Sequence, residues 1–221
     1  MASIELRSDL YRRPLARALE LLGFGPGWSC VDLGAGGGDV SIELARLAGP
    51  GGRVYAVDSS PIARDETAKA AARAGEAQVV ALTQRAEELL LPEQVDLASC
   101  RFLLLHVPEP PAVLVRMARV VRPGGYVVAE EPITTAGRIA GGPLSMPDAL
   151  HQDIGALLPG LFRQTGLEII DAWAEAPAGA GPGPVASYLA ELTGVDPGDE
   201  AIVLPPLVTV IGKVPGGGAS S

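Results

Sequence analysis

Two carboxylates on either side of a glycine-rich turn hold the clearest chemistry in this sequence. Gly34, Gly36 and Gly38 stand at alternate positions after a short apolar run. Glycines spaced in this way let a ligand approach the backbone where a Cβ atom would collide. The helix that follows directs free N–H groups into the same space. Asp32 lies before the turn, and Asp58 ends the next apolar run, where its carboxylate suits two vicinal ribose hydroxyls. The turn predicts a nucleotide-like ligand.

Candidate proton acceptors are few, since the chain has only two histidines. Imidazole accepts a proton near neutral pH, so His106 and His151 are candidate bases. His106 alternatively orients its loop, and His151 alternatively lies on a helix surface. Glu131 is a third catalytic candidate, able to anchor an amine or polarise a hydroxyl, with an ordinary strand-end acid as the alternative.

Arg101 and Tyr11 are candidates for holding ligand. Arg101 follows the fourth predicted strand, where it either binds a carboxylate or pairs with a neighbouring acid. Tyr11 lies on the first predicted helix, where it either closes over the ligand or packs in the core. Cys100 is more simply a small buried apolar residue than a nucleophile.

The elements that must position these residues alternate between strand and helix. Such alternation predicts βαβ units and an α/β fold with a doubly wound, mainly parallel sheet of seven strands and helices on both faces. Ligands bind such sheets beyond the carboxyl ends of the strands. The expected strands are 29–33, 53–58, 78–82, 95–100, 124–130, 167–173 and 203–214, and the expected helices are 9–23, 39–48, 61–74, 113–121, 147–165 and 185–193.

The sequence divides into a core and a small loop-rich cap. Residues 132–147 resemble a long active-site loop, and the Gly/Pro/Ala-rich residues 175–184 resemble a mobile linker. The expected divisions are a ligand-binding core at 1–136, a substrate-side cap with one sheet strand at 137–200, a returning strand at 201–214 and a disordered tail at 215–221.

Composition excludes several partners. The chain is 48% hydrophobic and 19% charged, with a net charge of -9. Nucleic acids and anionic membranes require a basic surface, so neither is an expected partner. Two cysteines without metal-ligand spacing predict a reduced protein with no structural metal. No apolar run has the length of a signal or a membrane span, so a cytoplasmic location is expected.

Several motifs in order resemble class I S-adenosylmethionine-dependent methyltransferases. The dinucleotide fingerprint requires a third glycine where this chain has Asp39, so a nicotinamide oxidoreductase is disfavoured. The glycine turn after Asp32 instead resembles methyltransferase motif I. The other matching segments are 54–58, 86–89, 95–99 with 103–107, and 122–125. One position departs from the family, because Arg85 occupies the place of an acid that binds the adenine amino group.

The resemblance implies S-adenosylmethionine as cofactor, S-adenosylhomocysteine as product, and an O, N or C atom of a small molecule as acceptor. It is strongest for bacterial enzymes of quinone and natural-product pathways. Alternatives are a cyclisation or rearrangement in the same fold, or a non-catalytic relict. A homodimer is a further expectation. The implied cofactor-binding residues are Tyr11, Asp32, Gly34, Ala35, Gly36, Gly38, Asp58, Ser59, Arg85, Ala86, Glu87 and Arg101.

Overall fold

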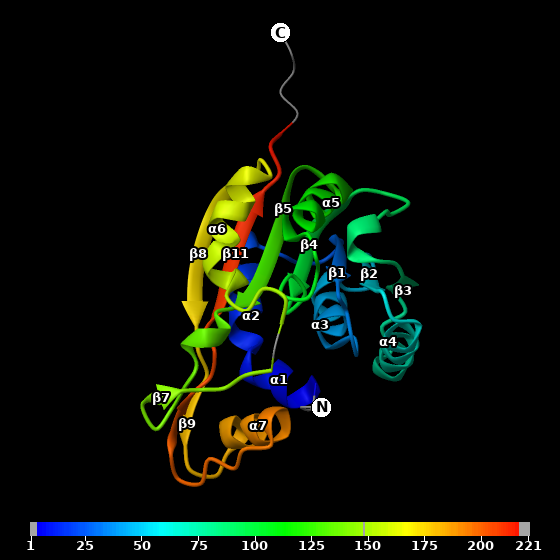
Figure 1. Cartoon of the computed structure of the whole chain (residues 1–221). Coiled ribbons are helices and arrows are strands. Elements are labelled where there is room, and N and C mark those ends of the chain that lie inside the picture. Colours follow the sequence, from blue (N-terminus) through cyan, green and yellow to red (C-terminus); the bar gives the residue numbers. More distant parts are fainter. Residues whose placement is uncertain (1–3, 148, 217–221) are drawn as a thin grey trace.

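A seven-stranded sheet forms the centre of the molecule (Figure 1). The computed structural model describes residues 4–147 and 149–216. The strands lie in the order β3, β2, β1, β4, β5, β11, β8. Their bounds are β1 Ser29–Leu33, β2 Arg53–Asp58, β3 Val79–Thr83, β4 Val95–Arg101, β5 Val121–Pro132, β8 Glu168–Glu175 and β11 Leu207–Lys213. Strands β1 to β5 pair in parallel, and β11 is antiparallel to both of its neighbours. The predicted fold class is confirmed.

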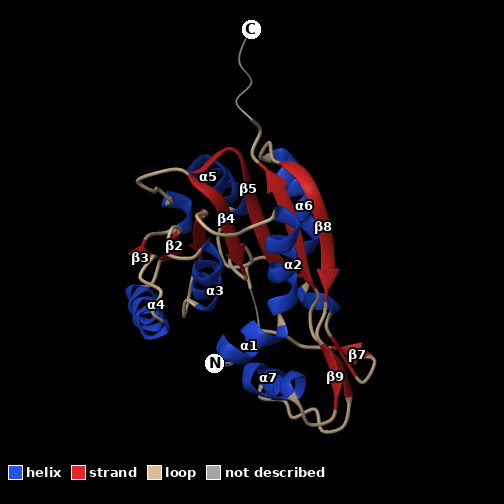
Figure 2. Ribbon diagram, turned by 180° about the vertical axis from the view of Figure 1, so that it is seen from behind, coloured by secondary structure: helices blue, strands red, loops and turns tan. Residues whose placement is uncertain are grey.

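Helices cover both faces of the sheet (Figures 1 and 2). Buried leucines of α2 and α3 pack on one face. Buried side chains of α5 and α6 pack on the other face. The helices are α1 Ile4–Leu10, α2 Arg12–Leu22, α3 Asp39–Ala48, α4 Pro61–Ala74, α5 Pro110–Val120, α6 Ile154–Gln164 and α7 Pro184–Thr193, with short 3-10 turns η1 Ala86–Glu88 and η2 Thr134–Ala136. Within the described ranges, no helix combines the length and apolarity needed to cross a bilayer.

Two expected helices are shorter than predicted. The helix expected over 9–23 breaks at Tyr11, which separates α1 from α2. Pro14 explains the break, because it has no N–H to donate to the carbonyl of residue 10 and its ring crowds that turn. The helix expected over 147–165 begins only at Ile154. Just before that start, the Asp153 carboxylate accepts the backbone N–H and the hydroxyl of Thr135.

The cap contains a second, four-stranded antiparallel sheet in the order β7, β6, β10, β9. Its strands are β6 Arg138–Ile139, β7 Gly142–Pro143, β9 Ala178–Ala180 and β10 Ala201–Val203. The predictions of a loop at 132–147 and a mobile linker at 175–184 are therefore wrong in part. Small residues are needed here for packing, since a Cβ at Gly179 would lie 3.3 Å from Val185 Cβ. With α7, this sheet lies beyond the carboxyl ends of the parallel strands (Figures 1 and 2).

The strand expected over 203–214 is divided between the two sheets. Val203 ends β10 in the cap, and Leu207 begins β11 in the main sheet. Pro205 and Pro206 lie between them and supply no backbone donor for either ladder. Of the predicted tail at 215–221, residues 215 and 216 have no helix or strand, and residues 217–221 lie outside the described residues.

Candidate active site

The glycine turn after β1 has a backbone that other residues adopt poorly. Gly34, Gly36 and Gly38 have φ values of 82°, 55° and 86°. A Cβ at Gly34 would lie 3.1 Å from Leu103 Cδ1, and one at Gly38 would lie 2.9 Å from Thr67 Cγ2. Both close approaches and the positive φ values require glycine. The turn therefore keeps β1, the loop after β4 and α4 close together.

Asp58 joins this turn to the end of β2. One carboxylate oxygen accepts the Gly36 N–H at 3.0 Å, and the other accepts the Ser60 N–H at 2.9 Å. A carboxylate oxygen has two lone pairs, so each can accept one further hydrogen bond. The Asp58 carboxylate is thus fixed in place and retains the capacity for two vicinal hydroxyls.

A cavity of about 210 Å³ opens beside Asp58. Leu33, Val57 and Leu103 provide apolar surface in it, which suits the faces of a planar base. Six of the predicted cofactor residues line it: Gly34, Asp58, Ser59, Arg85, Ala86 and Glu87. Gln84, Leu103, Val107 and Pro108 also line it and were not predicted. Because carboxylate and apolar walls share one space, the cavity fits a nucleoside, and we refer to it as the nucleoside cavity.

Arg85 lies at the rim of the nucleoside cavity. Its side chain is 62% exposed, and its guanidinium lies 3.6 Å from the Glu87 carboxylate, which is 26% exposed. An exposed pair of this kind contributes little to stability. Both side chains are therefore free to rearrange around a base.

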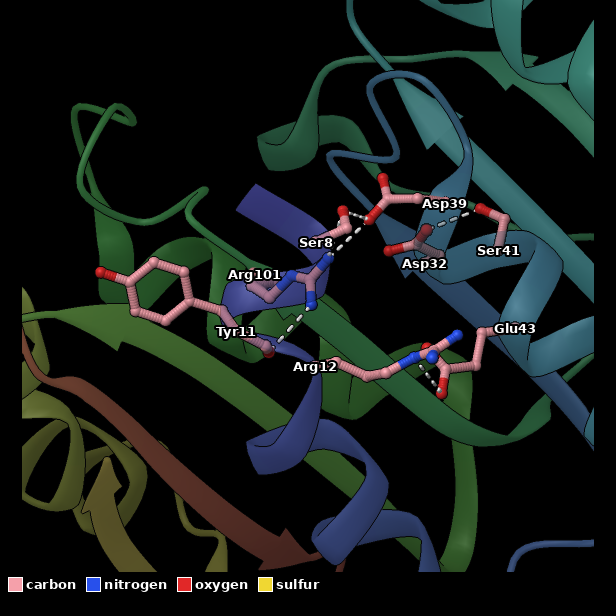
Figure 3. Close-up of polar contacts among 8 residues, drawn as sticks. All are labelled: Ser8, Tyr11, Arg12, Asp32, Asp39, Ser41, Glu43 and Arg101. Atoms are coloured by element: carbon pink, nitrogen blue, oxygen red, sulfur yellow. Dashed lines mark hydrogen bonds and ion pairs between the residues drawn. The ribbon is translucent and has the colours of Figure 1, made fainter. Parts of the chain in front are cut away.

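Other predicted cofactor residues support the backbone of the glycine turn and do not line the nucleoside cavity. Asp32 is 3% exposed and accepts the Ser41 hydroxyl at 2.6 Å (Figure 3). The N–H groups of Gly34 and Ala35 both donate to the Val57 carbonyl, at 2.8 and 3.0 Å. Asp32, Ala35, Gly36 and Gly38 are not among the residues that line this cavity.

Arg101, the last residue of β4, links this strand to α1 and α3 (Figure 3). Its guanidinium donates to Asp39 Oδ2 at 2.6 Å, to the Tyr11 carbonyl at 3.3 Å and to the Ser8 hydroxyl at 3.3 Å. Ser8 in turn donates to the same Asp39 oxygen. The Arg101 side chain is only 6% exposed, so this network replaces water around a buried charge. Of the two alternatives for Arg101, the structure shows the ion pair.

Removing the Arg101 charge is expected to destabilise the protein and loosen α1. Arg101→Met leaves the Asp39 carboxylate unpaired under the helix, at a cost of about 2 kcal/mol, less than for a fully buried pair because Asp39 is 25% exposed. Chemical denaturation and hydrogen exchange of residues 4–10 measure the two effects. Arg12→Met is the matched control, since its pair with Glu43 spans 4.0 Å and Arg12 is 61% exposed. Equal losses in both variants would contradict the assignment.

A second cavity of about 150 Å³ lies under the cap. Its walls are mainly aromatic and aliphatic, and its polar side chains include Arg7, His106 and Thr134 besides the two tyrosines Tyr11 and Tyr188. Tyr11 lines this cavity, with its hydroxyl donating to the Pro205 carbonyl at 3.1 Å. Tyr11 therefore lies beside the second cavity, which we call the cap cavity, and does not line the nucleoside cavity. The remaining lining residues are Phe102, Leu105, Pro132, Met146, Pro147, Ala149, Tyr188, Leu192 and Pro205.

The three catalytic candidates meet at the loop after β4, and one of them reaches the cavities. His106 lines both cavities. Glu131 is 0% exposed, and its carboxylate accepts the N–H groups of Leu103, Leu104 and Leu105 at 2.8, 2.7 and 3.3 Å. His151 bonds through its ring to the Val107 carbonyl at 3.1 Å. Glu131 and His151 line neither cavity. Their hydrogen bonds instead hold the loop that carries His106.

The electrostatics of His106 favour its neutral form. Partial burial, and secondly the positive charge of Arg7, hold the pKa of His106 below its usual value. A neutral imidazole has a free nitrogen lone pair that accepts a proton. His106 is therefore in the protonation state of a base at neutral pH.

Three buried acids are expected to make the folded protein less stable as the pH rises. Burial raises the pKa of Asp32 to about 7, of Glu130 to about 7 and of Glu131 to about 8. The folded chain therefore binds more protons than the unfolded chain between about pH 4 and pH 8, so the free energy of unfolding falls across this interval and levels off above pH 8. Thermal unfolding is expected to show Tm lower by about 5 °C or more at pH 8.5 than at pH 5.5. Glu130→Gln should flatten the profile, and a Tm that rises over this range would refute it.

The central part of this chain is similar to known methyltransferase domains. Residues 31–129 match the family model of a methyltransferase domain. Nocamycin O-methyltransferase of Saccharothrix syringae is 33% identical over 123 residues, which are 55% of this chain and 44% of the relative. The 2-phytyl-1,4-naphtoquinone methyltransferase of Trichormus variabilis is 38% identical over 109 residues, which are 48% of this chain and 47% of the relative. The match thus spans less than half of each relative.

The fold is that of a solved methyltransferase. The crystal structure of a SAM-dependent methyltransferase from Aquifex aeolicus superposes with a TM-score of 0.67 at 17% identity, covering 96% of this chain and 94% of that one. At this identity the likeness concerns the fold. In the part of the chain that the structure describes, no three His, Cys, Asp or Glu side chains form a metal-binding group.

Proposed function

We propose that this chain is a class I S-adenosylmethionine-dependent methyltransferase, and that it transfers a methyl group from S-adenosylmethionine to a small molecule bound in the cap cavity. The relatives named for nocamycin and a naphthoquinone support a small acceptor of specialised or quinone metabolism. The nucleoside cavity would hold the adenosine part of the cofactor, with Asp58 accepting from its ribose hydroxyls.

One observation carries the proposal: His106 lines both cavities. A methyl donor in the nucleoside cavity and an acceptor in the cap cavity would meet at this side chain. Methyl transfer from a sulfonium is an in-line displacement, so the protein mainly aligns the acceptor with the methyl carbon. No step requires a metal ion.

His106 would serve as the base for an acceptor with a dissociable proton. Its neutral imidazole would take that proton as the acceptor atom becomes alkylated. Glu131 and His151 would fix the backbone on either side of it. The apolar walls of the cap cavity would exclude water, which would otherwise compete with His106 for the proton and with the acceptor for the methyl group.

Binding and turnover test the proposal separately. Titration calorimetry of the purified protein with S-adenosylmethionine should show saturable binding. Release of S-adenosylhomocysteine should then depend on an added small-molecule acceptor. Absence of binding heat at high cofactor concentration would refute cofactor use. Binding without turnover on a broad acceptor panel would favour a non-methylating reaction in the same fold.

A further inference from the structure

The cap cavity contains a cation among aromatic walls. Arg7 of α1 lines it, and its guanidinium lies 5.2 Å from the centre of the Phe102 ring. After burial, its charge is the second cause that holds the pKa of His106 down, and it partly opposes the rise that burial gives to the pKa of Tyr11 and of Tyr188. The positive charge of Arg7 therefore acts on groups in several walls of the cap cavity.

Arg7 has unused donor capacity. Its Nε is buried and has no hydrogen-bond partner, and among the side chains that the structure describes, which exclude those of Glu5 and Asp148, no carboxylate forms an ion pair with Arg7. Four other arginines of the chain do form ion pairs with a carboxylate, namely Arg12, Arg17, Arg46 and Arg53. A buried guanidinium donor without an acceptor is costly unless a ligand supplies one.

The size and walls of the cap cavity limit the rest of the ligand. Its volume is about 150 Å³, and an apolar protein cavity of about that size holds a benzene ring. Tyr11, Phe102 and Tyr188 meet edge to face, with ring centres 5.2 and 6.4 Å apart. Aromatic rings favour such arrangements, so a further planar ring suits these walls.

We propose that the acceptor is a single-ring phenol bearing a carboxylate, which Arg7 binds while the phenol hydroxyl faces His106. The proposal rests on the proposed function and specifies its substrate class. The phenol oxygen forms the new bond to the methyl carbon. The S–CH₃ bond breaks, its electron pair goes to the sulfur, and the phenol proton goes to the His106 imidazole. A methoxybenzoate and S-adenosylhomocysteine result.

A neutral isostere of the acid tests the role of Arg7. Binding of ortho-, meta- and para-hydroxybenzoate and of the matching hydroxybenzamides is measured by calorimetry, with and without saturating S-adenosylhomocysteine. At least one acid should bind about tenfold or more tighter than its amide. Arg7→Met keeps a long apolar side chain and should abolish this preference, whereas Arg7→Lys should keep part of it. Arg12→Met removes a surface charge and should change nothing.

The outcomes separate this inference from the function on which it rests. Equal affinity for acid and amide in the unsubstituted protein would overturn the inference, even if neutral phenols are methylated. Weaker S-adenosylhomocysteine binding in Arg7→Met, with the acid preference intact, would also overturn it and would assign Arg7 to the cofactor. Arg7-dependent acid binding without any methyl transfer would support the recognition and refute the proposed reaction.

Discussion

Asp58→Ala is expected to weaken S-adenosylmethionine binding about 100-fold or more. Each ribose hydroxyl would lose a charge-assisted hydrogen bond, worth roughly 1.5–3 kcal/mol apiece, and about 3 kcal/mol corresponds to slightly more than 100-fold in Kd. The effect extends to the turn, because the same carboxylate holds the N–H groups of Gly36 and Ser60. Calorimetry with S-adenosylhomocysteine measures the loss.

A graded series separates ligand contact from damage to the turn. Asp58→Asn keeps one acceptor oxygen and should lose less affinity than the alanine variant. Asp65→Asn is the charge-matched control, since Asp65 lies on the neighbouring α4, pairs with Arg64 at 3.1 Å and does not line the nucleoside cavity. Unchanged cofactor affinity in a well-folded Asp58→Ala protein would remove Asp58 from the binding site.

Glu131→Ala is expected to give the largest loss of stability, on the order of 4 kcal/mol. Three backbone N–H groups around one buried carboxylate would lose their acceptor, and each costs about 1–3 kcal/mol when left unsatisfied. The loop that carries His106 would lose its inner support. Chemical denaturation measures the free energy of unfolding, and hydrogen exchange at residues 103–107 reports on the loop.

A milder substitution tests whether this support matters to catalysis. Glu131→Gln keeps an oxygen for two of the three N–H groups and should fold. Displacement of His106 should lower kcat about tenfold or more, with little change in cofactor affinity. Glu130→Gln is the control on the same strand, because Glu130 is equally buried but, within the described part of the chain, its side chain accepts a single hydrogen bond, from the Thr209 hydroxyl at 3.2 Å. If both glutamine variants retain full kcat, the positioning role of Glu131 is wrong.

The part of the site that follows local sequence rules was predictable. The glycine turn and Asp58 lie at strand ends, where the order of βαβ units alone determines which edges meet. Gly34, Asp58, Ala86 and Glu87 accordingly line one cavity. The cap differed from its prediction, because a run of glycine, alanine and proline is typical of both loops and tightly packed short strands.

The roles of buried acids and cations depend on contacts between distant segments. Glu131 and His151 carry side chains typical of catalysis, yet their partners are backbone groups of residues 103–107. Asp39 and Arg101 lie 62 residues apart, and Ser8 joins them from α1. No spacing in the sequence indicates these pairings. Arg7 had no signal at all, because it precedes the first predicted helix, 9–23, and only the structure places it on α1.

The place of β11 between β5 and β8 has a consequence for the order of folding. This strand pairs with both neighbours, and β8 has no other partner in the main sheet. Strands β1, β2 and β3, and separately β4 and β5, can therefore pair through contacts close in sequence, whereas β8 must wait for β11. Pairing Val208 with Glu131 closes a loop of more than 70 residues. This step is slow because closing a long loop costs chain entropy. During synthesis on the ribosome, the edge of the main sheet formed by β11 and β8 is thus completed last.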